Sequence, residues 1–303
     1  MLGDANMSGH QLRYLLEQPG TLILPGVYDC LGAKLAEQVG FEAVFTSGFG
    51  ISASTLGLPD YGLLTATEVL RSVGPMAQSI SIPLIADLDT GYGNPLNVIR
   101  TVTDALRWGI SGIILEDQVW PKKCGHFQGK QVIPAAEQVE KIKAAVHARE
   151  DSGLVIIGRT DARSPLGLEE AIDRGRLYAE AGADIVFIEA PQSLEELVTI
   201  ARAFAEEEVY LFANLIEGGK TPCLSQEQLQ ELGFKLGVYP LSGLFAATEA
   251  MLRCFQQLKE RGAIATESDR LSFPEFEQLI EVNRYWQLQQ QFTASSESIG
   301  DEE

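Results

Sequence analysis

The chain is poor in cysteine and in positive charge. It has four scattered cysteines, Cys30, Cys124, Cys223 and Cys254. None of them forms a Cys-X-X-Cys pair, so neither a disulfide framework nor a zinc site is indicated. The 23 lysines and arginines face 42 acidic residues, which gives a net charge of −19. A surface this acidic repels nucleic acid and anionic lipid, so we expect no nucleic acid and no membrane as a partner.

Long hydrophobic runs are also lacking. No apolar run is long enough to span a membrane, and residues 1–20 contain no stretch suited to a signal peptide. We therefore expect a cytoplasmic protein. Apolar residues make up 45% and charged residues 21% of the 303, which is ordinary for a globular protein. This length fits one large α/β barrel or two smaller domains.

Short apolar segments rich in β-branched residues recur along the chain, about every thirty residues, a spacing typical of βα units. The eight segments are Thr21–Val27, Ala43–Ser47, Ile82–Asp87, Gly112–Glu116, Leu154–Arg159, Asp184–Glu189, Val209–Asn214 and Phe234–Tyr239. Helical periodicity lies between them, as in Leu96–Trp108, Ala135–Arg149, Leu168–Ala181, Leu194–Ala205 and Ser225–Leu232. Eight strands that are apolar on both faces predict a closed parallel (β/α)8 barrel of the TIM type. An open doubly wound sheet is the alternative, although no Gly-X-Gly-X-X-Gly follows the first strand.

Residues 263–303 extend beyond the predicted barrel domain, which comprises residues 1–262. In this extension, Pro274–Gln291 is expected to form a helix with apolar residues spread around it. Such a helix must pack against something, and a neighbouring subunit is the candidate. The last residues, Ser295–Glu303, are polar and acidic, and we expect them to be disordered.

Carboxylates cluster where the third and fourth predicted strands end, which is the end of a TIM barrel that carries the active site. Asp87 and Asp89 lie two residues apart after the third strand, and Glu116 ends the fourth. Mg²⁺ prefers carboxylate and water oxygens, so these side chains indicate a magnesium site. The alternative is that the aspartates only cap the helix that begins at Asn94.

A cysteine with basic neighbours lies in the long loop after the fourth strand. The segment is Pro121-Lys122-Lys123-Cys124-Gly125-His126, and long barrel loops of this kind are often lids. Two lysines and a histidine beside a thiol should lower its pKa and make Cys124 reactive. The other three cysteines lack such neighbours, so we expect them to be inert.

Arg159 ends the fifth predicted strand, in the segment Gly158-Arg159-Thr160-Asp161-Ala162-Arg163. A guanidinium at a barrel mouth is suited to hold a carboxylate through two parallel hydrogen bonds. The alternative is a salt bridge with Glu189 or Glu116, and the two roles can coexist.

Five motifs together resemble those of a known enzyme family. They are Asp87-Leu88-Asp89-Thr90-Gly91-Tyr92-Gly93, Glu116-Asp117-Gln118, Pro121-Lys122-Lys123-Cys124-Gly125-His126, Gly158-Arg159-Thr160-Asp161-Ala162 and Glu217-Gly218-Gly219-Lys220-Thr221-Pro222. In this order, at predicted strand ends, they resemble the isocitrate lyase / phosphoenolpyruvate mutase superfamily. The branch that they resemble most contains methylisocitrate lyases, dimethylmalate lyases and petal-death-type oxaloacetate hydrolases. Many of its members carry the name carboxyvinyl-carboxyphosphonate phosphorylmutase.

The resemblance implies a role for individual residues. Asp87 and Asp89 would hold Mg²⁺, or Mn²⁺ in its place, with Glu116 in the outer coordination shell. Cys124 would be the proton donor on a closing lid, and Asp60 would lie near the metal on a mobile loop. The substrate would be bound by Ser47, Gly48, Phe49, Gly125, His126, Arg159, Glu189 and Asn214. The family's last helix is exchanged between subunits, which implies a homotetramer built as a dimer of dimers.

The chemistry that the resemblance implies is cleavage of a carbon–carbon bond in a small anionic 2-hydroxy or 2-oxo di- or tricarboxylate, through an enolate-like intermediate. Hydrolysis of oxaloacetate is the first alternative, and phosphonomutase chemistry on phosphoenolpyruvate-type substrates is the second. Phosphonopyruvate-forming members typically lack the Cys-Gly-His element, so its presence favours bond cleavage. A barrel that only binds a ligand is disfavoured because all these polar residues are present.

One segment departs from the methylisocitrate lyase pattern. In those enzymes, the stretch after the eighth strand resembles Tyr-Pro-Leu-Ser-Ala-Phe-Arg, and the arginine helps to hold the tricarboxylate. Here Phe245 stands in its place. Phenylalanine cannot pair with a carboxylate, so we expect a smaller and more apolar acid, such as an alkylated malate. Pro240 favours a lyase, because oxaloacetate hydrolases of this family tend to have serine there.

Overall fold

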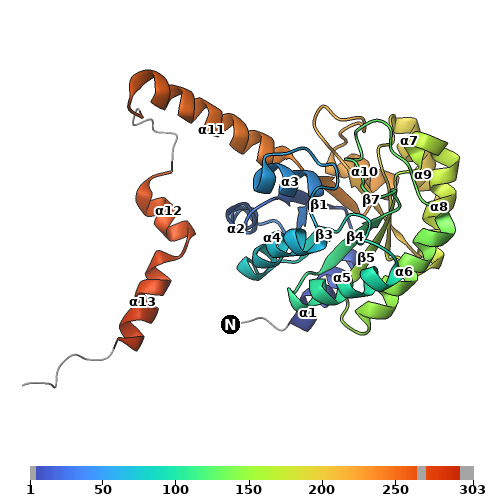
Figure 1. The fold of residues 1–303 in the computed structure, drawn as a ribbon, viewed down its shortest axis with the longest axis horizontal. Helices are drawn as coiled ribbons and strands as arrows, with labels where there is room; N and C mark the ends of the chain where they lie inside the picture. Colours follow the sequence, from blue (N-terminus) through green and yellow to red (C-terminus); the bar gives the residue numbers. More distant parts are fainter. Residues whose placement is uncertain (1–4, 265–270, 294–303) are drawn as a thin grey trace, which may run out of the picture. The chain divides into compact units, whose positions relative to one another are not determined.

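The computed structural model describes residues 5–264 and 271–293. The chain divides into two compact units, Met1–Ala250 and Met251–Glu303, whereas the sequence placed the boundary after residue 262. The first unit contains a closed barrel of eight parallel strands in the order β1 to β8 (Figure 1). Strand β1 pairs with β8 in parallel, with Leu22 beside Leu236. The TIM-type barrel is therefore confirmed, and an open sheet is excluded.

The eight strands closely match the apolar segments found in the sequence. Both faces of such strands are covered, by the barrel interior and by helices, so apolar residues fill nearly every position. The strands are β1 (Leu22–Val27), β2 (Val44–Thr46), β3 (Leu84–Asp87), β4 (Gly112–Glu116), β5 (Val155–Thr160), β6 (Ile185–Ile188), β7 (Tyr210–Asn214) and β8 (Leu236–Tyr239).

Helices follow the strands, and several begin at a polar residue that caps them. The side chains of Asn94, Ser193 and Ser225 accept hydrogen bonds from backbone N–H groups at the starts of α5, α9 and α10. The helices of the first unit are α1 (Ala5–Glu17), α2 (Cys30–Val39), α3 (Gly48–Leu56), α4 (Ala66–Ser79), α5 (Pro95–Arg107), α6 (Ala135–Arg149), α7 (Arg163–Leu166), α8 (Leu168–Glu180), α9 (Leu194–Ala203) and α10 (Gln226–Leu232), and α11 (Ser242–Arg261) begins there. No helix in the described ranges is long and apolar enough to cross a membrane.

Helix α1, which the sequence analysis did not identify, closes the N-terminal end of the barrel. Its residues Leu12, Leu15 and Leu16 are buried in one cluster with the inward-facing residues of the strands. Arg13 donates hydrogen bonds to the carbonyl oxygen of Gly153 and to the carboxylate of Asp184, at 2.8 and 2.9 Å. The opposite end of the barrel, where the strands finish, is not covered by α1 and can bind a ligand.

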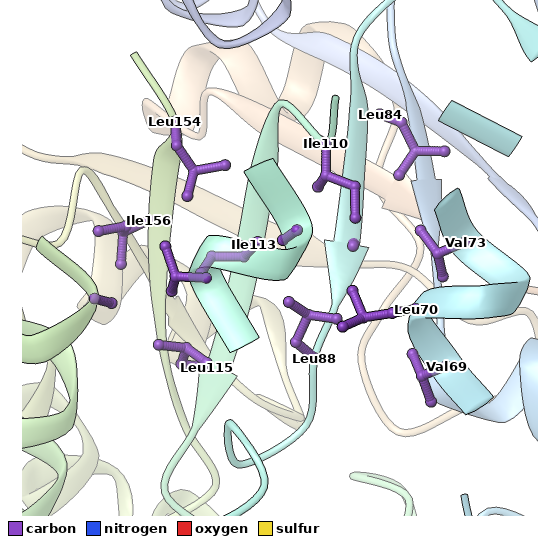
Figure 2. Packing of buried hydrophobic residues seen from close by; sticks show 14 of the residues in the cluster. Val69, Leu70, Val73, Leu84, Leu88, Ile110, Ile113, Leu115, Leu154 and Ile156 are labelled. Carbon is purple, nitrogen blue, oxygen red and sulfur yellow. The ribbon is translucent and has the colours of Figure 1, made fainter. Parts of the chain in front are cut away.

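A second cluster lies between the strands and the surrounding helices, as Figure 2 shows. Val69 and Val73 on α4 face Leu84 and Leu88, which lie in and just after β3. Burying each such side chain contributes roughly 1.5–3 kcal/mol. This packing fixes the strands against the helices, and thereby the residues at the strand ends.

The second unit contains the end of α11 and two further helices, α12 (Phe273–Leu279) and α13 (Val282–Phe292). The single helix expected over Pro274–Gln291 is therefore wrong. Glu281 lies between the two helices in the left-handed conformation, with φ of 59°, and such a residue cannot continue a right-handed helix. The expectation for Ser295–Glu303 falls outside the described residues.

Candidate active site

A pocket lies at the C-terminal ends of the strands, where barrels of this type bind their ligands. About 40 Å³ of it is open to the centres of water molecules, which is room for a few waters. It is lined by Phe45, Ser47, Phe49, Asp60, Asp87, Lys122, Cys124, Gly125, His126, Arg159, Phe187, Glu189, Asn214, Ile216, Pro240 and Leu241. Most of the site residues expected from the sequence line this pocket, the exceptions being Gly48, Asp89 and Glu116. Each of these three lies directly against a residue that does.

Buried carboxylates surround one ammonium group at the end of β3. Asp87 accepts hydrogen bonds from the backbone N–H groups of Gly48 and Asp89, each at 3.1 Å. Lys122 Nζ lies 2.7 Å from the Asp89 carboxylate and 2.6 Å from that of Asp60. Burial raises the pKa of Asp89 to about 6, and Lys122 only partly offsets this effect. One ammonium does not balance three carboxylates, so the site favours a further cation.

Glu116 supports the same conclusion from the neighbouring strand β4. Its side chain is fully buried, and neither carboxylate oxygen has a hydrogen-bond partner within the described residues. Arg159 Nε lies 3.3 Å from Oε2, in ion-pair contact but outside hydrogen-bond geometry. Burial raises the pKa of Glu116 well above its usual value, although Arg159 opposes this. Such a carboxyl is stable as the neutral acid or beside a cation.

These carboxylates fit magnesium better than a metal held entirely by protein ligands. Among the residues that the structure describes, no three His, Cys, Asp and Glu side chains converge closely enough to hold a metal ion. Mg²⁺ keeps several of its waters and takes one or two carboxylates. Asp87 and Asp89 can supply those carboxylates, and Glu116 is within electrostatic reach of Asp87.

The N-terminus of α3 faces the same carboxylates. Ser47 caps this helix by accepting a hydrogen bond from the N–H of Gly50 at 3.0 Å. A β-carbon at Gly48 would lie 2.9 Å from Lys122 Nζ and 3.1 Å from an Asp89 oxygen, so only glycine fits here without displacement. N–H groups at a helix start favour anions, and this helix start can receive a carboxylate.

Cys124 lies in the loop between β4 and α6, residues 117–134, which we call the β4–α6 loop. The expectation that neighbouring lysines give this thiol a low pKa is wrong. Lys122 does lower the pKa, but burial outweighs this effect, and both lysine side chains are paired with other groups. Lys122 pairs with Asp60 and Asp89, and Lys123 donates to the Gly129 carbonyl oxygen. Burial raises the pKa of the Cys124 thiol to about 11, outweighing the hydrogen bond from the backbone N–H of His126. A thiol with this pKa is protonated at neutral pH, as a proton donor must be.

Iodoacetamide should therefore alkylate Cys124 slowly. With its pKa raised from 9.0 to about 11, the thiolate, which is the reactive form, is about a hundredfold scarcer at neutral pH than in an ordinary cysteine. The rate for the folded protein should keep rising with pH until about pH 11, whereas that of the urea-unfolded chain levels off near pH 9. Peptide mass spectrometry measures both rates. A folded-state rate that levels off below pH 8 would contradict a buried thiol.

Arg159, Glu189 and His126 form a polar wall opposite the β3 carboxylates. Arg159 Nη2 lies 3.3 Å from Glu189 Oε2, and His126 Nε2 lies 3.2 Å from Glu189 Oε1. Burial opposes ionisation of Glu189, but Arg159 and His126 outweigh it and lower its pKa. His126 Nδ1 accepts a hydrogen bond from the backbone N–H of Lys220 at 3.2 Å. Asn214 donates to Glu189 at 3.4 Å, so the salt bridges expected for Arg159 occur within a larger network.

Gly125 makes the closest approach of the β4–α6 loop to this wall. A β-carbon there would lie 2.5 Å from Arg159 Nη2 and 2.6 Å from two carbons of Glu189. No other residue can occupy this position without displacing both charged groups. The loop backbone therefore packs directly on the arginine that is expected to hold a substrate carboxylate.

Apart from Phe49, the apolar side of the pocket was not anticipated from the sequence. It is formed by Phe45, Phe49, Phe187, Ile216 and Leu241, together with Pro240. The guanidinium of Arg159 lies 5.0 Å from the centre of the Phe187 ring, an attractive cation–π distance. The alternation of side chains along a strand could have indicated which residues face the barrel interior. It does not hold at the strand ends, because the chain curves into loops there. Phe245, by contrast, does not line the pocket and is 44% exposed.

The family model described as phosphoenolpyruvate phosphomutase matches residues 12–259 of this chain. The petal death protein of Dianthus caryophyllus is 44% identical over 92% of this chain and 87% of its own length. The 2,3-dimethylmalate lyase of Eubacterium barkeri is 41% identical over 93% of this chain and 97% of its own length.

Solved structures agree with these sequence comparisons. The crystal structure of 2,3-dimethylmalate lyase has a TM-score of 0.89 at 32% identity and covers 100% of both chains. Oxaloacetate acetylhydrolase in complex with 3,3-difluorooxalacetate has the same score and identity, over 96% of this chain and 99% of its own. Phosphonopyruvate hydrolase in complex with oxalate and Mg²⁺ has a TM-score of 0.85 at 30% identity, over 94% and 99%. All three match this chain over at least 94% of its residues.

Proposed function

Because the chain belongs to the isocitrate lyase / phosphoenolpyruvate mutase superfamily, we propose that it is a Mg²⁺-dependent lyase that cleaves a carbon–carbon bond of a small 2-hydroxy dicarboxylate. The observation that carries the proposal is the buried Cys124 thiol, which lines the pocket with Asp87 and Arg159 and whose pKa is raised by that burial. A lyase needs such a proton donor, whereas transfer of a phosphoryl group does not.

Different residues of this chain carry out the different steps of the proposed reaction. Arg159 and the N-terminus of α3 bind the substrate carboxylates. Asp60, which lines the pocket, accepts the proton of the 2-hydroxyl group as the carbon–carbon bond breaks. The electron pair of that bond passes to the leaving carboxylate fragment, and Cys124 protonates its carbon. Mg²⁺, when bound by Asp87 and Asp89, supplies a Lewis acid that stabilises the developing negative charge.

The proposed substrate is an alkylated malate, because one side of the pocket is apolar. Phe45, Phe187 and Ile216 offer surface for methyl groups, and each buried methyl contributes about 0.8 kcal/mol. Pro240, which also lines the pocket, supports a lyase over an oxaloacetate hydrolase. The relative solved with 3,3-difluorooxalacetate keeps hydrolysis as the second candidate.

We expect kcat/KM with Mg²⁺ to be higher for 2,3-dimethylmalate than for 2-methylisocitrate, oxaloacetate or phosphonopyruvate. A methylisocitrate lyase would use an arginine where this chain has Phe245, so a third carboxylate has no equivalent cation here. Steady-state kinetics with identification of the products by NMR measures the order. Oxaloacetate at the top would assign the hydrolase, and 2-methylisocitrate at the top would refute the argument from Phe245.

Assembly into a homotetramer is a further part of the proposal. None of the described residues of α11, α12 or α13 is buried, and Phe255, Phe273 and Trp286 are each at least 59% exposed. Exposed apolar surface of this extent marks a protein interface, and a second copy of the chain, exchanging these helices, would cover it.

Truncation after Gly262 should therefore give smaller or aggregated species, measured by light scattering coupled to size exclusion. The matched control ends at Thr293 and keeps α12 and α13, so it should have the same number of subunits as the intact protein. A chain of residues 1–262 with that same number of subunits would exclude the exchange of these helices.

A further inference from the structure

We propose that Lys130 is a positioning residue that couples the seating of the β4–α6 loop to the orientation of Arg159. Its Nζ donates one hydrogen bond to the carbonyl oxygen of Gly125 and lies 2.6 Å from the carboxylate of Asp161. Gly125 belongs to the loop that carries Cys124, and Asp161 follows β5. One ammonium therefore joins the loop to the barrel. The inference rests on the proposed function only where turnover is measured.

The Lys130–Asp161 pair is completely withdrawn from water, with both side chains 0% exposed. Burying an ion pair costs several kcal/mol per ion in desolvation, and apolar residues of similar volume often stabilise a fold as well or better. A gain in folding stability therefore does not explain well why an ammonium occupies this position. Its three hydrogens, by contrast, can hold a loop carbonyl and a carboxylate at the same time.

Asp161, which Lys130 holds, in turn fixes the orientation of Arg159. Its carboxylate accepts from Arg159 Nε at 2.9 Å and from Nη2 at 3.2 Å, a two-point contact that fixes the plane of the guanidinium. Burial opposes ionisation of Asp161, but Arg159 and Lys130 outweigh it and lower its pKa. The backbone N–H of Asp161 donates to Asp117 at 2.8 Å, which holds Asp161 from the barrel side.

Asp117 is itself fixed by groups that do not reach the pocket. It accepts from Thr160 Oγ1 and the Tyr178 hydroxyl, each at 2.7 Å, and from Arg174 at 3.0 Å. Asp161 therefore has a rigid support from Asp117, at the start of the β4–α6 loop. Among the hydrogen bonds of the described residues, Lys130 is its one contact with the rest of that loop, residues 118–134.

On the loop side, Gly125 contacts both Lys130 and Arg159. Its backbone packs on Arg159 and Glu189 so closely that a β-carbon would clash with both, and Lys130 holds its carbonyl oxygen. The position of Gly125 and the direction of Arg159 are thus set by the same ammonium. Losing it removes one of the hydrogen bonds that hold the Cys124 segment in place and one of the two cations that hold Asp161.

The test is Lys130→Met, which keeps the length and apolar stem of the side chain and removes its charge. We expect kcat/KM to fall by about 10–100-fold, the range seen when a residue that orients a metal-binding side chain is replaced. We also expect iodoacetamide to label Cys124 at least about tenfold faster in the folded protein. Lys143→Met is the matched control, because Lys143 is a half-exposed lysine of α6 paired only with Glu140 in the described structure. It should change neither rate.

The labelling measurement needs no turnover, so it tests the role of Lys130 whether or not the proposed substrate is correct. Asp161→Asn separates positioning from simple loss of stability: added to Lys130→Met, it should lower kcat/KM by less than the product of the two single effects. If Lys130→Met does not fold by circular dichroism, Lys130→Gln, which keeps one donor, replaces it with the same expectations. A folded Lys130 variant with labelling and kcat/KM within twofold of the parent overturns the proposal, as does a strictly multiplicative double variant.

Discussion

Replacing Asp87 by alanine should abolish Mg²⁺-dependent turnover, lowering kcat/KM by at least about 10³, the equivalent of roughly 4 kcal/mol of lost transition-state stabilisation. Asp87 lines the pocket at the end of β3, and its carboxylate is one of the two proposed as direct ligands of the metal. Titration of activity with Mg²⁺, together with calorimetry of Mg²⁺ binding, measures the effect on the metal and on the reaction separately.

Asp87 also accepts the N–H groups of Gly48 and Asp89, so the alanine variant could disturb α3. Asp87→Asn keeps an acceptor oxygen for these groups and loses the charge, and it should be nearly as inactive. Asp173→Ala on α8 is the matched control, since that aspartate is 60% exposed and should leave activity unchanged. Activity that survives EDTA, or that survives both changes at Asp87, would refute the metal site.

The second large effect is expected from Cys124→Ser, which should lower kcat by about 10²–10⁴, the contribution typical of a general acid. Serine fills nearly the same volume, but a hydroxyl is a far weaker acid than a thiol, so protonation of the product carbon becomes slow. Substrate binding should stay within severalfold of the parent, because Arg159 and α3 hold the carboxylates. Single-turnover kinetics separate the chemical step from binding.

Cys223→Ser is the control for this variant, because Cys223 is exposed and does not line the pocket. It should have the parent's kcat. A Cys124→Ser variant with near-normal kcat would show that another group donates the proton, and the pH profile of that variant would then identify its pKa.

The fold could be derived from the sequence because strands buried on both faces leave an unambiguous pattern of apolar segments. Helix α1 could not, because only Leu12, Leu15 and Leu16 carry its packing and the rest of residues 1–20 is largely polar. The break at Glu281 was also missed, because a glutamate in the left-handed conformation has no sequence signature.

The site residues converged because the ends of parallel strands meet at one rim of the barrel. What failed was the inference from sequence neighbours to spatial neighbours. Lys122 and Lys123 flank Cys124 in the chain, yet their ammonium groups turn to Asp60 and to the Gly129 carbonyl. The apolar wall was missed for a related reason, since the tilt of the strands decides which of their residues face inward.

Helix α1 has a consequence for the order in which this chain can fold. Arg13 on this helix binds Gly153 and Asp184, which are made 140 and 171 residues later. Until then Leu12, Leu15 and Leu16 have no completed barrel end to pack against. Since β1 must also wait for β8 to close the sheet, the helix α1 and the strand β1 both depend on segments made much later. Contacts of such long sequence separation slow folding, and apolar surface waiting for its partner is exposed to aggregation, so this chain should be prone to aggregate until the barrel is complete.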